Sequence, residues 1–109
     1  NKNDRHILIV ENNGAIANMQ DDAMVEVVCE LGINGPRPMR VGNIPQFNLG
    51  LLVNQVSCEK LIVDAYFENS YQKALEAFTL NRLINDAKKA RKVLDALIEA
   101  NKGMWPELR

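Results

Sequence analysis

The hydrophobic residues of this chain follow two periods, one typical of strands before residue 45 and one typical of helices after it. Residues 5–11 (RHILIVE) contain four consecutive apolar side chains, so a strand here is apolar on both faces, and such strands are normally covered on both faces. If the chain is a piece of a larger protein, one of these covering layers is expected to belong to the rest of that protein. Residues 12–14 (NNG) end this strand, because asparagine and glycine tolerate a positive φ. The first predicted element is therefore a buried strand followed by a turn.

Two further strands are predicted after an irregular connection. Residues 24–31 (MVEVVCEL) alternate, with two valines, a cysteine and a leucine on one face, which predicts a half-buried strand. The Asn-Gly pair within residues 32–35 is a strong hairpin signal. Residues 36–41 (PRPMRV) return as a short strand, and their two prolines favour an edge of the sheet.

Helical periodicity begins at Pro45, a residue suited to the first turn of a helix. Apolar spacings of three and four then continue to residue 66, so either one helix runs through with a kink or Ser57 caps a second segment. Ser70 is predicted to cap the next helix, and Asn85 or Asp86 the last one. Each helical segment has an expected apolar face. For the segment that ends near residue 66 it consists of Cys58, Leu61, Ile62, Ala65 and Tyr66, and for the helix after Ser70 of Tyr71, Ala74, Leu75 and Phe78. For the last helix it consists of Ala87, Ala90, Leu94, Leu97 and Ile98.

Strands followed by helices predict an α+β fold, with a small antiparallel ribbon of about three strands and then a layer of three to four α-helices. The 109 residues fit one domain, in which residues 1–44 are mainly strands and loops and residues 45–109 mainly helical. Because the chain starts without methionine and reaches a strand almost at once, we expect it to be a piece of a longer protein.

Charge and cysteine usage narrow the class of protein. The 13 basic and 14 acidic residues balance, so nothing indicates nucleic acid or an acidic membrane surface as a partner. No apolar run reaches the roughly 20 residues of a membrane span. Cys29 and Cys58 lack the CxxC spacing and are expected to be buried free thiols. The sequence therefore predicts a cytoplasmic globular domain.

No complete catalytic site is present in the sequence. His6 is the single histidine and has no partner at a metal-binding spacing, so we expect a structural or surface histidine. The two glycine-rich motifs that bind phosphate groups, GxGxxG and GxxxxGK[ST], do not occur in the sequence. The remaining candidates are interpreted as turn or solvated residues, namely the carboxylates Asp21, Asp22 and Glu26 and the basic residues Lys88, Lys89, Arg91 and Lys92 of the last helix.

One long stretch resembles the C-terminal region of family 4 glycoside hydrolases. In that family an N-x-G-x-I-x-N-L-x-x-D-x-x-V-E-V-P-C stretch precedes N-G-x-x-P-x-x-V-G-x-[IL]-P. The matching residues here are Asn12, Gly14, Ile16, Asn18, Asp22, Val25, Glu26, Val27, Cys29, Asn34, Gly35, Pro38, Val41, Gly42, Ile44 and Pro45. Val28 and Met19 depart from the family's proline and leucine. The helical tail, above all residues 100–108, is similar to the 6-phospho-α-glucosidases that act on maltose 6′-phosphate.

The resemblance implies the C-terminal domain of a lactate-dehydrogenase-like glycosidase, the parent of this chain. In such enzymes NAD⁺ oxidises the sugar at C3, and a tyrosine then removes the C2 proton. The C1 oxygen leaves by elimination, water adds, and the hydride finally returns from NADH to the sugar. A divalent metal, usually Mn²⁺, polarises the sugar oxygens, and the NAD⁺ lies on a Rossmann half near the N-terminus. The substrate is a phosphorylated disaccharide, and family members form dimers or tetramers. Subunit contacts are expected from Phe47, Leu51, Leu61, Tyr66 and Trp105.

The family's C-N-x-P and G-[LF]-N-H metal motifs do not occur in this chain. We therefore expect no catalytic, NAD-binding or Mn²⁺-binding residue here and no activity of the chain alone. Asn13, Gly14, Ile16 and Asn18 lie either along the wall of the substrate cleft or in a turn that only joins two core strands. The alternatives are a non-catalytic oligomerisation or interaction domain, and the same region of a 6-phospho-β-glucosidase or α-galactosidase of the family.

Overall fold

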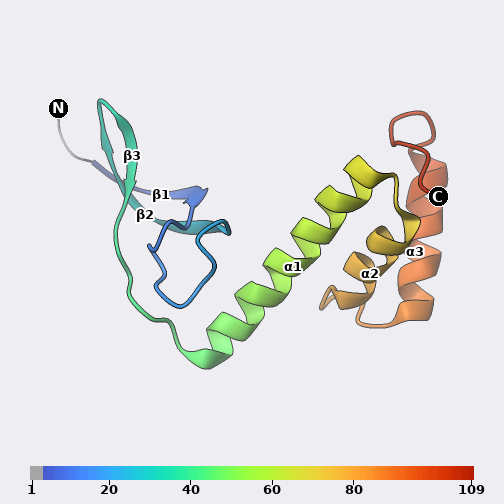
Figure 1. Ribbon diagram of the computed structural model, residues 1–109, viewed down its shortest axis with the longest axis horizontal. Helices are drawn as coiled ribbons and strands as arrows, with labels where there is room; N and C mark the ends of the chain where they lie inside the picture. Colours follow the sequence, from blue (N-terminus) through green and yellow to red (C-terminus); the bar gives the residue numbers. More distant parts are fainter. Residues whose placement is uncertain (1–3) are drawn as a thin grey trace. The chain divides into compact units, whose positions relative to one another are not determined.

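The computed structural model describes residues 4–109, with three strands followed by three helices. The strands are β1 (Asp4–Glu11), β2 (Met24–Gly32) and β3 (Gly35–Pro38), and the helices are α1 (Gln46–Glu68), α2 (Tyr71–Leu80) and α3 (Ala87–Ala100) (Figure 1). This confirms the α+β fold class. The chain divides into two compact units between Val53 and Asn54, within α1, and each unit is described by itself below.

The first unit is built on an antiparallel sheet of order β1-β2-β3. Its inner face carries Val25, Val27 and Cys29, each at most 6% exposed, as the alternation along β2 predicts. On the opposite face Ile7 and Ile9 are 66% and 69% exposed. Among the described residues no layer covers this outer face, which agrees with the expectation that one covering layer belongs to the rest of a larger protein.

The third strand is shorter than predicted. Residues 36–41 were expected to pair as a strand, but β3 ends at Pro38. After one more bond, from the Met39 N–H to the Val28 carbonyl, the chain leaves β2. Its next partners lie in the connection between β1 and β2, where the Val41 N–H bonds to the Ala15 carbonyl. Strand β3 ends early because the backbone groups of the residues after Met39 bond to this loop instead of to β2.

The helix boundaries follow the predicted caps. The Ser70 hydroxyl accepts a hydrogen bond from the Lys73 N–H at the start of α2, and the Asp86 carboxylate accepts one from the Lys89 N–H at the start of α3. Helix α1 runs without interruption through Ser57, so of the two readings left open there the single helix is confirmed.

The core of the second unit is small and tightly closed. Ala65, Ala74 and Leu94 are at most 2% exposed and bring together α1, α2 and α3. The C-terminal segment returns to this core. The Tyr71 N–H bonds to the Arg109 carbonyl at 3.0 Å, and the Arg109 N–H bonds to the Asn69 carbonyl at 2.8 Å. Partly buried side chains complete the packing, namely Tyr71, Leu75, Phe78, Ile98 and Leu108.

Among the helices of residues 4–109, none is long and apolar enough to cross a membrane.

Candidate functional site

The loop between β1 and β2 is held from inside by one buried amide. The Asn12 side chain is fully buried. Its Nδ2 donates to the carbonyls of Ile16, Met19 and Gln20 at 3.0, 3.3 and 3.1 Å, and its Oδ1 accepts from the Ile16 N–H at 2.7 Å. A buried polar group is stable only when it is paired, so this side chain fixes the path of the loop. Sequence reasoning gave Asn12 only a role in the turn.

A second amide fastens the same loop from outside. The Asn18 Nδ2 donates to the Ile44 carbonyl and its Oδ1 accepts from the Ile44 N–H, both at 3.0 Å. This pair of bonds imitates one rung of a β-ladder. Nearby, Ile16 forms a parallel bridge with Gly42. The loop is thus tied to the segment that follows β3.

These contacts decide what each predicted cleft residue offers a ligand. Ile16 is 5% exposed, so its side chain belongs to the core of the first unit. The Asn18 amide is engaged by Ile44. Asn13 and Gly14 form the accessible part, with φ of 41° and 79°, and the Asn13 Nδ2 donates to the Glu11 carboxylate at 3.1 Å. The structure brings the four residues together in one rigid loop, and a role in a substrate cleft stays a prediction.

One end of the outer face of the sheet carries a cluster of three charged residues. Glu30 on β2 faces Arg37 on β3 and Arg5 on β1, with the Arg5 guanidinium 3.8 Å from the carboxylate. The hydrogen bond from Arg37 lowers the pKa of Glu30, with a smaller contribution from the charge of Arg5. This end of the sheet is therefore a solvated ion-pair cluster, whereas the middle of β1 is apolar.

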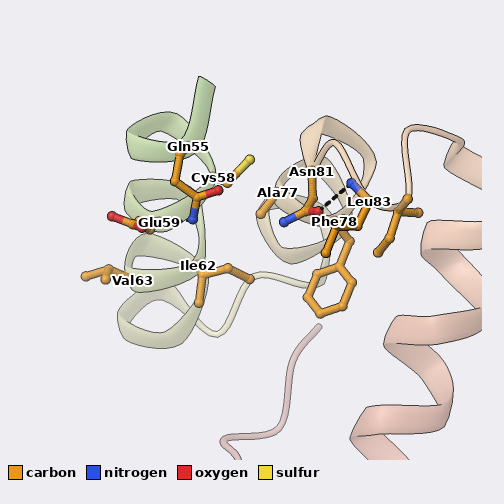
Figure 2. Close-up of a pocket in the computed structure, with 10 residues that line it drawn as sticks. Gln55, Cys58, Glu59, Ile62, Val63, Ala77, Phe78, Asn81 and Leu83 are labelled. Carbon is orange, nitrogen blue, oxygen red and sulfur yellow. Dashed lines mark hydrogen bonds between the residues drawn. The ribbon is translucent and has the colours of Figure 1, made fainter. Parts of the chain in front are cut away.

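The second unit contains an apolar groove of about 550 Å³. Figure 2 shows that α1 supplies one wall, with Cys58 and Ile62, and that the other wall comes from the end of α2 and the segment after it, with Phe78 and Leu83. Asn81 accepts the Leu83 N–H at 3.0 Å and so shapes the rim. Burial raises the pKa of the Cys58 thiol, which keeps it protonated and unreactive. The groove has no set of groups for catalysis.

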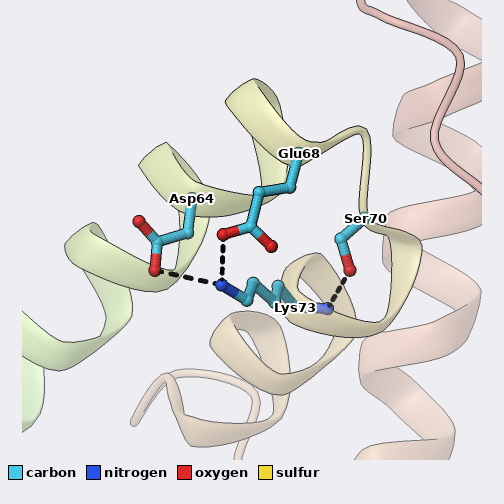
Figure 3. Close-up of polar contacts among 4 residues, drawn as sticks. All are labelled: Asp64, Glu68, Ser70 and Lys73. Carbon is cyan, nitrogen blue, oxygen red and sulfur yellow. Dashed lines mark hydrogen bonds and ion pairs between the residues drawn. The ribbon is translucent and has the colours of Figure 1, made fainter.

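Polar contacts tie the helices of this unit together. The Lys73 ammonium on α2 lies 2.6 Å from the Glu68 carboxylate and 3.3 Å from Asp64, both on α1 (Figure 3). The hydrogen bond to Glu68 is the main cause that raises the pKa of Lys73. Between α2 and α3 the Tyr71 hydroxyl donates to Asp95 at 2.7 Å, which raises the pKa of Tyr71. Each contact has a structural role, and none faces the groove.

The remaining predicted candidates are distributed over both units. Cys29 and Cys58 are buried free thiols, as expected. His6 is exposed at the edge of the sheet, as expected of a surface histidine. The carboxylates and basic residues that were interpreted as turn or solvated residues are all exposed, namely Asp21, Asp22, Glu26, Lys88, Lys89, Arg91 and Lys92. Over residues 4–109 no group of three or more His, Cys, Asp or Glu side chains could hold a metal ion.

Comparison with known proteins gives the family. A family model described as the family 4 glycosyl hydrolase C-terminal domain matches residues 1–84. A maltose-6'-phosphate glucosidase of Clostridium acetobutylicum is 53% identical over 99% of this chain and 24% of its own length. One of Bacillus subtilis is 55% identical over the same shares. The chain thus spans about a quarter of the length of these curated relatives.

Solved structures agree with the sequence comparison. A crystal structure of a 6-phospho-alpha-glucosidase from gut microorganisms, in complex with NAD and Mn²⁺, is 82% identical with a TM-score of 0.96, over 99% of this chain and 25% of that one. The 6-phospho-beta glucosidase from Thermotoga maritima, with NAD and glucose-6-phosphate, is 28% identical with a TM-score of 0.86, over 95% and 26%. Sequence and structure therefore agree that this chain belongs to family 4 of the glycosyl hydrolases, as a C-terminal domain.

Proposed function

We propose that this chain is the C-terminal part of a 6-phospho-α-glucosidase that hydrolyses phosphorylated disaccharides such as maltose 6′-phosphate. The observation that carries the proposal is the 82% identity to a solved 6-phospho-alpha-glucosidase over 99% of the chain. Identity to proteins named 6-phospho-beta-glucosidase is lower, at 40% for one from Bacillus subtilis and 30% for one from Thermotoga maritima. The α-glucosidase is therefore favoured over the β-glucosidase alternative.

The parent enzyme is proposed to use NAD⁺ and Mn²⁺, because the similar 6-phospho-alpha-glucosidase was solved with both. The residues described for this chain do not fit the metal, since they contain no cluster of three ligating side chains. We assign both groups to the rest of the parent. Hydrolysis by NAD-dependent oxidation, elimination and addition is likewise proposed for the parent only, and the chain alone is expected to be inactive.

The direct test is an assay of the purified parent with the 6-phosphates of p-nitrophenyl α- and β-glucoside and α-galactoside. We expect turnover of the α-glucoside when NAD⁺ and Mn²⁺ are present and its loss after chelation with EDTA. Preference for the β-glucoside or the α-galactoside would contradict the assignment. Turnover by the 109-residue chain itself would contradict the placement of the catalytic groups outside it.

The accessible part of the loop between β1 and β2 is proposed to line the substrate cleft. Asn13 and Gly14 support this because both are held in left-handed backbone conformations on a loop fixed from two sides. N13A in the parent is expected to raise KM for the phosphorylated substrate. The control N101A removes an amide that bonds within the α3 C-terminus, and it should leave KM unchanged. Equal KM values for N13A and wild type would favour a turn without substrate contact.

The parent is also proposed to be a cytoplasmic homo-oligomer, a dimer or tetramer. Two buried thiols without a disulfide fit a reducing compartment. Of the five apolar side chains expected at subunit contacts, three are accessible, with Phe47 75%, Tyr66 57% and Trp105 38% exposed, whereas Leu51 and Leu61 are partly buried. A non-catalytic assembly domain is the second candidate, favoured by the exposed apolar side chains that each unit carries. Light scattering on the parent tests oligomer formation, and the activity assay separates the two candidates.

A further inference from the structure

The two edges of the sheet differ in their backbone chemistry. In an antiparallel ladder, the N–H and C=O groups of successive residues point to opposite edges. Since the Met39 N–H bonds to β2, the N–H positions of Pro36 and Pro38 point to the free edge of β3. Proline has no N–H, so this edge offers no donors there and cannot be extended.

The free edge of β1 is open by the same rule. The Asn12 N–H bonds to the carbonyl of Ala23, the residue before β2. In the register of the β1-β2 ladder, the backbone groups of Leu8 and Val10 therefore point toward β2 and those of Ile7 and Ile9 point away from it. Ile7 and Ile9 also carry the exposed side chains of the outer face. Residues 6–10 contain neither proline nor Asp, Glu, Lys or Arg. Native proteins normally protect such an edge, and among the described residues this one has no cover.

The sequence along this edge is complementary to itself. When two copies of β1 are placed antiparallel with Leu8 opposite Leu8, Ile7 lies opposite Ile9 of the second copy. In the same register Arg5 lies opposite Glu11, so opposite charges meet at both ends. All four residues have their backbone groups at the free edge, which this register requires. Arg5 is free to take part because its side chain is 64% exposed and its contact with Glu30 is long, at 3.8 Å.

We propose that β1 pairs with β1 of a second copy of this chain, forming a continuous six-stranded sheet across a two-fold axis. The pairing specifies one interface of the homo-oligomer proposed above, and it rests on the proposal that such an oligomer forms. The partner is a second copy because the edge is self-complementary in charge and in apolar side chains, as a two-fold interface requires. A strand from another part of the same parent polypeptide is the competing occupant, and the experiments below distinguish the two.

Charge reversal tests the register. R5E alone places like charges opposite each other in the two-fold pair, and so does E11R, so each should weaken the dimer on the order of tenfold. An equimolar mixture of the R5E and E11R chains restores opposite charges in a mixed dimer, and the double variant R5E/E11R restores them in its own. Recovery of dimer in both cases, measured by sedimentation velocity, supports the pairing. Absence of a dimer in the unmodified chain, or no recovery on mixing, would overturn it.

Hydrogen exchange at the backbone amides of β1 tests the pairing in the unmodified chain, so the result does not depend on whether the variants fold. In the dimer the amides of Ile7 and Ile9 should exchange at least about tenfold more slowly than in the dilute monomer. The amides of Leu8 and Val10, which bond within the sheet, serve as internal controls and should change little. In the parent, the same protection should depend on protein concentration. Protection that is independent of concentration and unaffected by R5E would assign the edge to the parent's own chain and overturn the proposal. None of these readouts depends on glycosidase activity.

Discussion

Replacing Asn12 by alanine should destabilise the first unit more than any other single amide deletion in its loop. The Nδ2 group has two protons shared among three carbonyls, and Oδ1 accepts a further bond, so about three full hydrogen bonds are lost. Each contributes about 1 kcal/mol net, and the carbonyls left behind are shielded from water because the side chain is fully buried. We therefore expect N12A to lower the free energy of unfolding by about 3–4 kcal/mol.

The matched control is N18A, which removes two bonds to Ile44 from an exposed position where water can replace them. It should cost only about 1 kcal/mol. The fluorescence of Trp105, the single tryptophan, is not a suitable probe because Trp105 belongs to the second unit and the loop to the first. The assay is therefore native-state hydrogen exchange at the Ala15 and Ala23 amides, whose partners lie within the loop. A loss for N12A no larger than that for N18A would refute the assignment of Asn12 as the internal support.

Three further predictions concern the second unit. D95N should bring the pKa of Tyr71 back toward its ordinary value of 10.0, measured by near-ultraviolet titration with the other tyrosine replaced by phenylalanine; an unchanged pKa would contradict the role of the hydrogen bond. Because the pKa of Lys73 is raised above 10.5, its stabilising contribution is complete below that pH and is lost as the pH rises through the folded-state value; the stability gap between wild type and K73M should therefore close in that range, whereas a constant gap would contradict it. L94A should cost about 2–5 kcal/mol in urea unfolding because Leu94 is fully buried, whereas L83A, at a side chain 95% exposed, should stay within about 0.5 kcal/mol; equal losses would refute the packing.

Local signals in the sequence were sufficient for most of the fold. Ser70 and Asp86 mark the starts of α2 and α3 because their side chains satisfy backbone N–H groups within one turn, and such bonds depend only on neighbouring residues. The alternation along residues 24–31 likewise assigned the buried face of β2, although Leu31 at its end is 37% exposed. Short-range chemistry of this kind can be read without knowing the tertiary structure.

The features that sequence reasoning missed all depend on the tertiary structure. The early end of β3 follows from competition by the loop around Ala15, more than 20 positions away. Asn12 looks like an ordinary turn residue until its burial is known. The exposed face of Ile7 and Ile9 is apolar in sequence just as a covered face would be. The four residues predicted at the cleft lie in one loop, but the pattern could not show that Ile16 is buried or that Asn18 is already bonded.

The prolines of β3 also bear on how large an assembly can become. Strand pairing is dangerous when both edges of a sheet can accept partners, because each added copy then offers a new edge and the structure grows into a fibre. Here Pro36 and Pro38 remove the outward donors from one edge, so a sheet joined through β1 ends at both sides. Replacing these prolines would turn a closed pair into a polymerising unit. Two residues that look like poor choices for a strand thereby set the upper limit on its association.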